Sequence, residues 1–256
     1  MDKLARVCSP ARPTMSEDRS YAQWGEDKLV WEYFHRKPHG FFVEVGANDP
    51  IIISQTYLLE QNGWEGILVE PQPECCKRLR PARPKSKVIQ AACGAPEQKG
   101  KARFRIASND GCSLLDGLMT DEDVTFAETV EVDLVTVDDV LTQSGNPKPD
   151  FVSIDVEGGE LNVLKGFSLA KHKPRLLLME DHVRDLSVHK YLRGQGYKLV
   201  RRTGSNNWYV PEETPFPVSL SERWRLCRKM YLATPLRQLK HAFRHRKDSV
   251  PSTGGG

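Results

Sequence analysis

Carboxylate side chains follow four of the five apolar strands that the sequence predicts. Glu44 lies near the end of the first strand, Glu70 follows the second, and Asp155 and Glu180 follow the last two. Because the carboxyl ends of parallel strands meet at one edge of a sheet, we expect these side chains to lie close together. Carboxylates grouped in this way can accept a proton from a hydroxyl, pair with a cationic ligand or hold a divalent metal ion.

Gly46 and Glu70 have the spacing of a nucleoside site. A glycine after the first strand lets the backbone turn tightly and come close to a ligand. Glu70 stands 24 residues later, at the end of the second strand, where a carboxylate can accept hydrogen bonds from both ribose hydroxyls. The sequence has no G-x-G-x-x-G motif, and Asn48 stands where its second glycine would allow a pyrophosphate to approach. This disfavours a nicotinamide-dependent oxidoreductase and favours S-adenosylmethionine, whose cationic end would suit Glu44.

A carboxylate or an imidazole at these strand ends could serve as a general base. The candidates at the last two strand ends are Asp155, Glu157, Glu180 and His182, with Asp155 nearest the strand tip. The same cluster could instead hold a divalent ion through carboxylate oxygens and an imidazole. We favour direct base catalysis without a metal ion. Glu160 is best explained as an acid favoured by the dipole at the start of a helix.

The charges of the chain are segregated. The 256 residues include 37 Lys and Arg and 34 Asp and Glu, but residues 221–247 alone contain nine basic residues and one acid. The acidic remainder gives no electrostatic reason to expect nucleic-acid binding. In the basic segment, apolar residues recur at helical spacing on both sides of Pro235, which is typical of two short basic amphipathic helices that contact an anionic membrane. These residues are Trp224, Cys227, Tyr231, Leu236, Leu239 and Phe243. Folding of this segment back onto the acidic body is the alternative.

The elements that would position these residues are short apolar strands alternating with helices, which indicates an α/β fold with a parallel sheet. The segment YKLVRRTGSNNWYVP predicts a closing hairpin that adds an antiparallel edge. Residues 1–19 are polar and lack periodicity, so we expect a disordered lead-in before a domain over 20–215 and a basic tail over 216–256. The six cysteines have irregular spacing, which favours reduced thiols in a cytoplasmic enzyme. The basic segment would attach this enzyme to a membrane at most peripherally.

Several blocks of the sequence resemble the FkbM-type S-adenosylmethionine-dependent methyltransferases, in the same order. They are YAQWGEDKLV, FFVEVGAND, NGWEGILVEPQP, VDLVTVDDVL, FVSIDVEGGELNVLKGF and PRLLLMEDH, and together they extend from about Tyr21 to Pro211. The resemblance implies a class I methyltransferase (Rossmann-like) fold, with a mostly parallel seven-stranded sheet, an antiparallel C-terminal hairpin strand and helices on both faces. It also implies O-methylation of a hydroxyl on a sugar, glycolipid or secondary metabolite, and hence a small-molecule or glycan acceptor.

The resemblance also implies roles for individual residues. Glu44, Gly46 and Asn48 match the first cofactor motif, Glu70 matches the ribose-binding acid, and Asp155 and Glu157 match the acidic motif of the fourth strand. Gln23 or Asp27 would reach the cofactor from the N-terminal helix, with a solvated helix face as the alternative. After the third strand the sequence offers only small residues and backbone, which leaves Ala92 on the adenine side. A non-catalytic adaptor that retains the fold is a further alternative, although such a protein would not need these acids.

Overall fold

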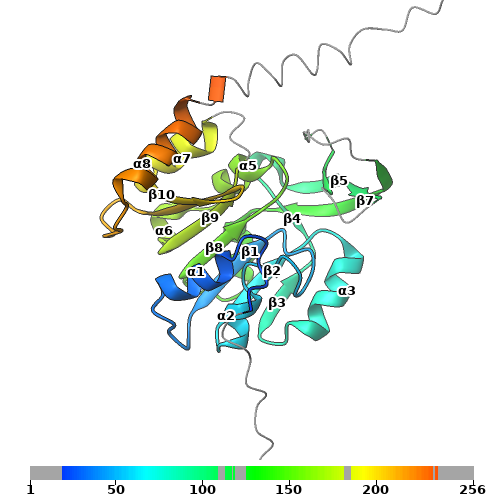
Figure 1. The fold of residues 1–256 in the computed structure, drawn as a ribbon. Helices are drawn as coiled ribbons and strands as arrows, with labels where there is room; N and C mark the ends of the chain where they lie inside the picture. Colours follow the sequence, from blue (N-terminus) through cyan, green and yellow to red (C-terminus); the bar gives the residue numbers. More distant parts are fainter. Residues whose placement is uncertain are drawn as a thin grey trace, which may run out of the picture.

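The computed structural model describes residues 19–108, 113–116, 118, 125–181, 186–232 and 234–235. Its core is a seven-stranded sheet (Figure 1). Across the sheet the strands are β10 (Tyr197–Thr203), β11 (Asn206–Pro211), β9 (Leu176–Glu180), β8 (Phe151–Ile154), β1 (Phe41–Val45), β2 (Glu65–Val69) and β3 (Ser86–Ile89).

The five strands from β9 to β3 pair in parallel, and β11 runs antiparallel to both of its neighbours. This confirms the predicted α/β fold with an antiparallel hairpin strand. From the sequence we expected the antiparallel strand at the edge of the sheet, and the structure corrects that position. The antiparallel strand β11 lies inside the sheet and β10 forms the edge, because the hairpin pairs with β9 through its second strand.

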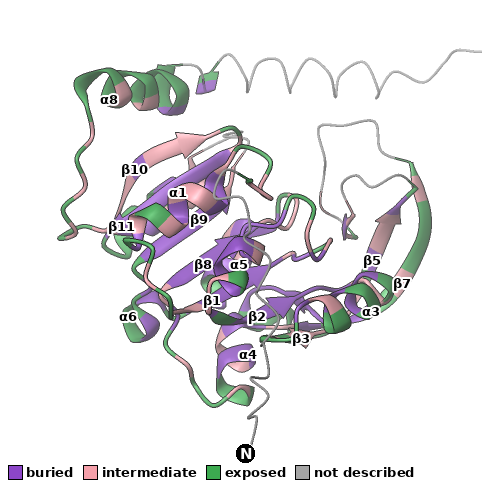
Figure 2. Cartoon of the chain, turned by 60° about the horizontal axis from the view of Figure 1, so that its bottom comes forward, coloured by how far each residue is buried: buried purple, intermediate pink, exposed green. Residues whose placement is uncertain are grey.

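Helices cover both faces of the large sheet, as predicted. One face carries α1 (Glu26–Tyr33), α2 (Tyr57–Gln61) and α3 (Pro73–Ala82). The other face carries α4 (Val137–Gln143), α5 (Glu160–Lys165), α6 (Leu169–His172) and α7 (Ser187–Gly194). Figure 2 shows the central strands almost wholly buried between these layers. Burial on both faces explains why these strands are nearly continuous apolar runs.

The first helix begins later than its apolar pattern suggests, because its own acids fix the preceding segment. The Glu26 carboxylate accepts a hydrogen bond from the backbone N–H of Trp24 at 2.9 Å. Asp27 accepts one from the backbone N–H of Tyr21 at 2.7 Å, and both acids are buried. Glu26 also accepts a hydrogen bond from the Asn206 side chain at 2.9 Å, which ties this segment to the hairpin.

A second, four-stranded sheet stands beside the carboxyl edge of the large one. Its strands are, in order, β4 (Ala92–Cys93), β7 (Phe126–Val135), β5 (Gly100–Ala107) and β6 (Leu114–Leu115), and the short helix η1 (Pro96–Gln98) lies between β4 and β5. Its inner residues, among them Ala92, Phe104 and Leu134, form a separate apolar cluster. From the sequence we predicted one sheet, so the second sheet corrects that expectation.

The described part of the C-terminal segment is helical and lies against the hairpin. It contains α8 (Leu220–Cys227) and the π-helical turn η2 (Arg228–Leu232). Met230 is buried, and the Tyr231 hydroxyl lies 2.8 Å from Nε2 of His189 on α7. Residues 1–18 of the predicted lead-in over 1–19 lie outside the described residues, as does the predicted tail beyond residue 235. Among the helices that the structure does describe, none has the length and apolar character that crossing a bilayer requires.

Candidate active site

A cavity of about 460 Å³ opens at the carboxyl edge of the large sheet, where the small sheet meets it. One wall is formed by the residues that end β1, β2 and β8, and the opposite wall comes from β5, β6 and β7. This volume lies in the range of roughly 300–1,000 Å³ that is common for small-molecule sites. Six of the residues that the sequence singled out line it: Gly46, Asn48, Glu70, Ala92, Asp155 and Glu157.

The turn after β1 is set by Gly46, whose φ of 87° falls in the left-handed region. Its N–H donates to the carbonyl oxygen of Val69 at 2.9 Å, which holds the turn against the end of β2. Asn48 is also left-handed, with φ 45°, and its side chain hydrogen-bonds to the Cys75 thiol at 3.5 Å. The turn therefore brings backbone close to the cavity at a point where most side chains would obstruct it.

Glu70 is a buried carboxylate held by two backbone N–H groups. Oε2 accepts from Asn48 at 2.9 Å and Oε1 accepts from Gln72 at 2.8 Å. Burial raises the pKa of Glu70, and these two hydrogen bonds partly oppose that shift. A carboxylate has about four acceptor positions, so two remain for a ligand. The geometry suits a diol such as the two hydroxyls of a ribose.

The small sheet supplies an apolar wall that sequence reasoning missed. Phe104, Leu115 and Leu134 line the cavity opposite the carboxylates, and Ala92 belongs to the same apolar cluster. An apolar wall of this kind can pack against one face of an aromatic base. Alternation in KARFRIA would place Phe104 on the inner face of a strand, but the sequence does not show which cavity that face lines.

Three carboxylates meet at the ends of β8 and β9. Asp155, Glu157 and Glu180 each contribute an oxygen, and these oxygens lie within 4.8 Å of one another. The pKa of Asp155 is raised well above its usual range, first by burial and then by the charge of Glu180, to which it is hydrogen-bonded. Asp155 therefore holds a proton more strongly than an exposed aspartate does. The three oxygens are hard ligands that would also suit Mg²⁺ or Mn²⁺.

Glu160 opens α5 and fixes the loop that carries Glu157. Its Oε1 accepts hydrogen bonds from the backbone N–H groups of Val156 at 3.3 Å and Gly158 at 3.0 Å. Burial raises the pKa of Glu160 to about 7 despite these hydrogen bonds. The position at a helix start agrees with the explanation given for this acid from the sequence.

Glu44 does not line the cavity. It points to the opposite face of the sheet, where Thr56 Oγ1 donates to Oε2 at 2.6 Å and the Gln55 N–H donates to Oε1 at 3.1 Å. Arg83 lies in the same buried cluster and donates to Thr56 Oγ1 at 2.8 Å and to Glu60 at 2.7 Å. In the structure Glu44 therefore anchors the loop between β1 and α2.

Two further residues that the sequence singled out are not brought to the cavity by the described structure. Gln23 is exposed on the segment before α1 and is absent from the cavity wall. His182 lies outside the described residues, just after Asp181. The described members of the predicted base cluster are therefore its three carboxylates.

Comparison with curated proteins gives no match. Solved structures similar to this chain include a precorrin-6y C5,15-methyltransferase from Geobacter metallireducens, at 12% identity over 75% of this chain and 89% of that chain, with a TM-score of 0.38. Another is an O-methyltransferase from Bacillus cereus in complex with SAH, at 12% identity over 72% and 80%, with a TM-score of 0.41. A third is a TehB-like SAM-dependent methyltransferase from Corynebacterium glutamicum, at 10% identity over 74% and 88%, with a TM-score of 0.38.

The sequence itself matches the family described as "Methyltransferase FkbM domain" over residues 44–199. That match covers more than half of the chain and includes the ends of β1, β2, β8 and β9, where the cavity and its carboxylates lie. The chain therefore belongs to the FkbM methyltransferase family and is an S-adenosylmethionine-dependent methyltransferase, and its seven-stranded sheet with one antiparallel strand is the α/β fold that the resemblance implied.

Proposed function

We propose that the enzyme methylates a hydroxyl group on a sugar, glycolipid or secondary metabolite. The observation that carries this proposal is the raised pKa of Asp155 in the cavity wall, beside Glu157 and Glu180. A hydroxyl is a weak acid, so its methylation benefits from a base with an affinity for protons above that of an ordinary aspartate. A base at Asp155 would assist the methylation of a neutral amine less than that of a hydroxyl.

The residues along the cavity fit the cofactor of the family. Glu70 would accept hydrogen bonds from the ribose hydroxyls, and the turn at Gly46 and Asn48 leaves room for the cofactor to approach the backbone. Ala92 and Phe104 would cover the adenine. When bound, S-adenosylmethionine supplies the methyl group from a sulfonium, and the carboxylate of Asp155 would face the cationic end of the molecule.

Asp155 is the residue that we assign as general base. In its ionised form the Asp155 carboxylate takes the proton of the acceptor hydroxyl as the oxygen becomes nucleophilic, and the protonated carboxyl then donates a hydrogen bond to the Glu180 carboxylate. Glu157, with φ 55°, adds negative charge at the same point of the cavity. Since methyl transfer is an in-line displacement, the main task of these groups is to align the acceptor oxygen.

The acceptor class can be identified by comparing cells that contain this enzyme with cells that carry Asp155→Asn in its place. Mass spectrometry of their metabolites and glycans should reveal a species that is heavier by one methylene unit only with the parent enzyme. Fragmentation should place the added methyl on oxygen. A methyl on nitrogen or carbon, or the same product from the variant, would overturn the assignment.

A specific observation also favours contact with a membrane surface. Leu220, Trp224, Cys227 and Tyr231 recur at intervals of four, three and four residues, and all are exposed, with Leu220 at 83% and Trp224 at 63%. Arg223 and Arg228 flank this stripe. We infer that the stripe lies on an anionic bilayer, because an exposed apolar face between basic residues is typical of interfacial helices.

This contact can be tested by co-sedimentation with phosphatidylglycerol and phosphatidylcholine vesicles. The parent enzyme should sediment with the anionic vesicles at low salt, and Trp224→Ser should remain in the supernatant. Ile52→Ser, which removes an exposed apolar residue from the loop after β1, should behave like the parent. Equal behaviour of all three proteins would exclude the membrane role.

A further inference from the structure

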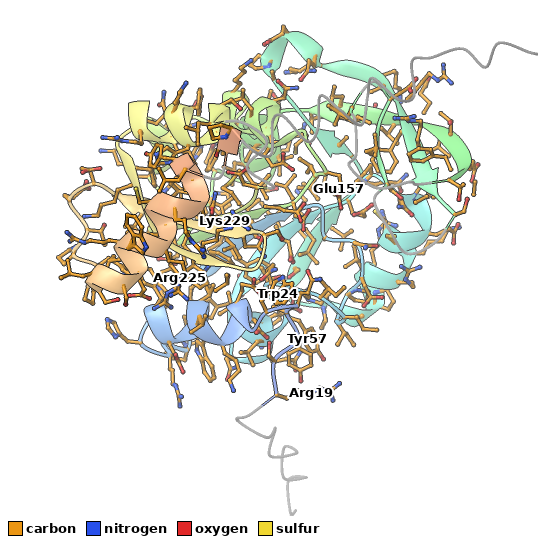
Figure 3. All side chains as sticks on the ribbon, turned by 45° about the horizontal axis from the view of Figure 1, so that its top comes forward. Arg19, Trp24, Tyr57, Glu157, Arg225 and Lys229 are labelled. Atoms are coloured by element: carbon orange, nitrogen blue, oxygen red, sulfur yellow. The ribbon has the colours of Figure 1, made fainter. Side chains whose placement is uncertain are left out.

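Trp24 is an exposed tryptophan whose ring packs on the β10–β11 hairpin. It lies where the segment before α1 meets that hairpin (Figure 3), and it is 55% exposed. A β-carbon added at Gly204, in the turn of the hairpin, would stand 2.2, 2.3 and 2.4 Å from Nε1, Cδ1 and Cε2 of the indole. An approach through the Nε1 edge would leave the two carbon atoms distinctly farther away, so Gly204 lies under the face of the ring. One face of the indole is thus covered, and its exposed surface belongs to the other side.

The backbone of Trp24 is tied to the same hairpin through Glu26. The Glu26 carboxylate is fully buried. Its Oε2 accepts a hydrogen bond from the backbone N–H of Trp24 at 2.9 Å, and its Oε1 accepts one from the side chain of Asn206 at 2.9 Å. Both the ring and the backbone of Trp24 are therefore held in position. A side chain that is already ordered loses little conformational entropy when a ligand packs against it, and this favours binding.

The turn of the hairpin places Trp24 at the end of β9. Ser205, which follows Gly204 in the turn, accepts a hydrogen bond through its carbonyl oxygen from the backbone N–H of Asp181 at 3.0 Å. Glu180 is the last residue of β9, and alternation along this strand points its side chain to the face of the sheet that α1 covers. Trp24 precedes α1 on that face. The indole and the Glu180 carboxylate are therefore on the same side of the sheet and at the same edge.

The carboxylate cluster stands between Trp24 and the main cavity. Asp155 lines that cavity, which extends from it to the small sheet, whereas Trp24 does not line it. The carboxyl of Asp155 is also hydrogen-bonded to Glu180, on the side of Trp24. The proposed function places the cofactor in the cavity, and an in-line displacement needs the acceptor oxygen and the sulfur on opposite sides of the methyl group. This requirement leaves the side of Glu180 and Trp24 for the acceptor.

We propose that a sugar ring of the acceptor stacks on the open face of Trp24. The C–H groups on one face of a sugar ring are apolar and slightly positive, and they pack well on the electron-rich face of an indole. The hydroxyls of the ring point outward from its rim, where the carboxylates at the ends of β8 and β9 can accept hydrogen bonds from them. The inference rests on the proposed function and selects the carbohydrate among its acceptors, as a free sugar or as the headgroup of a glycolipid.

The stacking can be tested by saturation-transfer NMR with the methyl glycosides of glucose, galactose, mannose and fucose, in the presence of S-adenosylhomocysteine. The parent enzyme should bind at least one of them through its ring C–H groups and should not bind sorbitol, which has no ring. Trp24→Ala should weaken this binding at least about fivefold, and Trp24→Phe should retain most of it. Trp224→Ala removes a tryptophan that is 63% exposed on α8, and should bind like the parent. Absence of glycoside binding to the parent, or equal loss in Trp224→Ala, would overturn the proposal.

Further measurements separate the role of Trp24 from the proposed function. S-adenosylhomocysteine should bind the parent and Trp24→Ala equally, which shows that the cofactor site is intact. With the acceptor that mass spectrometry identifies, Trp24→Ala should raise KM at least about fivefold and change kcat by less than about twofold. A methylated oxygen on a molecule without a sugar ring would overturn the role of Trp24 and leave O-methylation in place. A methylated nitrogen on a sugar that needs Trp24 for binding would do the reverse.

The same variant tests whether the indole contacts a bilayer instead. Trp24→Ala should sediment with phosphatidylglycerol vesicles as the parent does. Loss of vesicle binding in Trp24→Ala, together with unchanged glycoside binding, would assign the exposed face to a membrane and overturn the proposal.

Discussion

Gly46 lies so close to Asp155 that a β-carbon added at position 46 would stand 1.8 Å from the Asp155 carbonyl oxygen. The turn after β1 and the end of β8 are therefore in direct backbone contact. This one contact positions both the turn that we assign to the cofactor and Asp155, the assigned base. No side chain fits between them without moving one of the two strand ends.

Gly46→Ala should destabilise the fold and abolish binding of S-adenosylhomocysteine. We expect a loss of at least about 4 kcal/mol in the free energy of unfolding, because the clash adds to the cost of a left-handed alanine. Gly145→Ala is the matched control: φ is 86° there but no atom lies within 4 Å, so only the conformational cost of about 1–2 kcal/mol remains. Equal losses in urea titrations would contradict the close contact.

Glu70→Gln should weaken binding of S-adenosylhomocysteine by about 1.5–3 kcal/mol, because it removes a charged acceptor for the ribose hydroxyls. The amide keeps the shape of the side chain, but its NH2 group cannot accept, so one of the two hydrogen bonds from the backbone N–H groups of Asn48 and Gln72 is lost as well. Calorimetry measures the change. Glu74→Gln on the exposed face of α3 should have no effect, and an unchanged affinity in Glu70→Gln would remove Glu70 from the ribose site.

Asp155→Asn should lower kcat by about 10²–10⁴-fold while leaving the affinity for S-adenosylhomocysteine within a few-fold of the parent. The substitution preserves size and removes the base. Glu157→Gln, in the same cluster, should reduce kcat much less. A variant with asparagine at position 155 and normal kcat would transfer the role to Glu157, Glu180 or His182.

Activity should persist after treatment with EDTA. Our assignment uses Asp155 as a base and Glu180 as its hydrogen-bond partner, which requires no ion between these carboxylates. The assay is methyl transfer before and after chelation, with the chelator removed by dialysis. Activity that disappears and returns with magnesium or manganese would instead make Asp155, Glu157 and Glu180 a metal site.

Glu160 should make the stability depend on pH. Its pKa of about 7 in the folded protein exceeds the model-peptide value of 4.5, so the folded state binds the proton more tightly. The proton on Glu160 adds about 3 kcal/mol to the free energy of unfolding. This contribution is fully present below pH 4.5 and is lost as the pH rises through about 7. Glu160→Gln should flatten the pH dependence of the free energy of unfolding over this window. Parallel curves for parent and variant would contradict the raised pKa.

The order of strands and helices could be predicted because burial on both faces makes each central strand an apolar run, as in FFV and LLLM. Gly46, Glu70 and Asp155 could be placed together for a similar reason, since parallel strands all end at one edge. These inferences use only local pattern and a topological rule. They do not depend on which distant segment packs against which.

The small sheet could not be predicted, because β5 and β7 are half-exposed and their patterns do not reveal their partners. Phe104 was missed as a consequence. The environment of Glu44 was hidden for a related reason: alternation along β1 places it on the face opposite Val43 and Val45, but not beside Thr56 and Arg83. Contacts between segments far apart in the chain decide both cases.

The two walls of the main cavity belong to different sheets. Glu70 and Asp155 stand on the large sheet, while Phe104 and Leu115 stand on the small one, whose apolar cluster is separate. Substitutions in β5 and β6 can therefore reshape the cavity without disturbing the strand ends that carry the carboxylates. Because Phe104 is assigned to the adenine, Leu115 is the position on the small sheet where evolution or directed mutagenesis could redirect the enzyme toward new acceptors while the methylation chemistry stays the same.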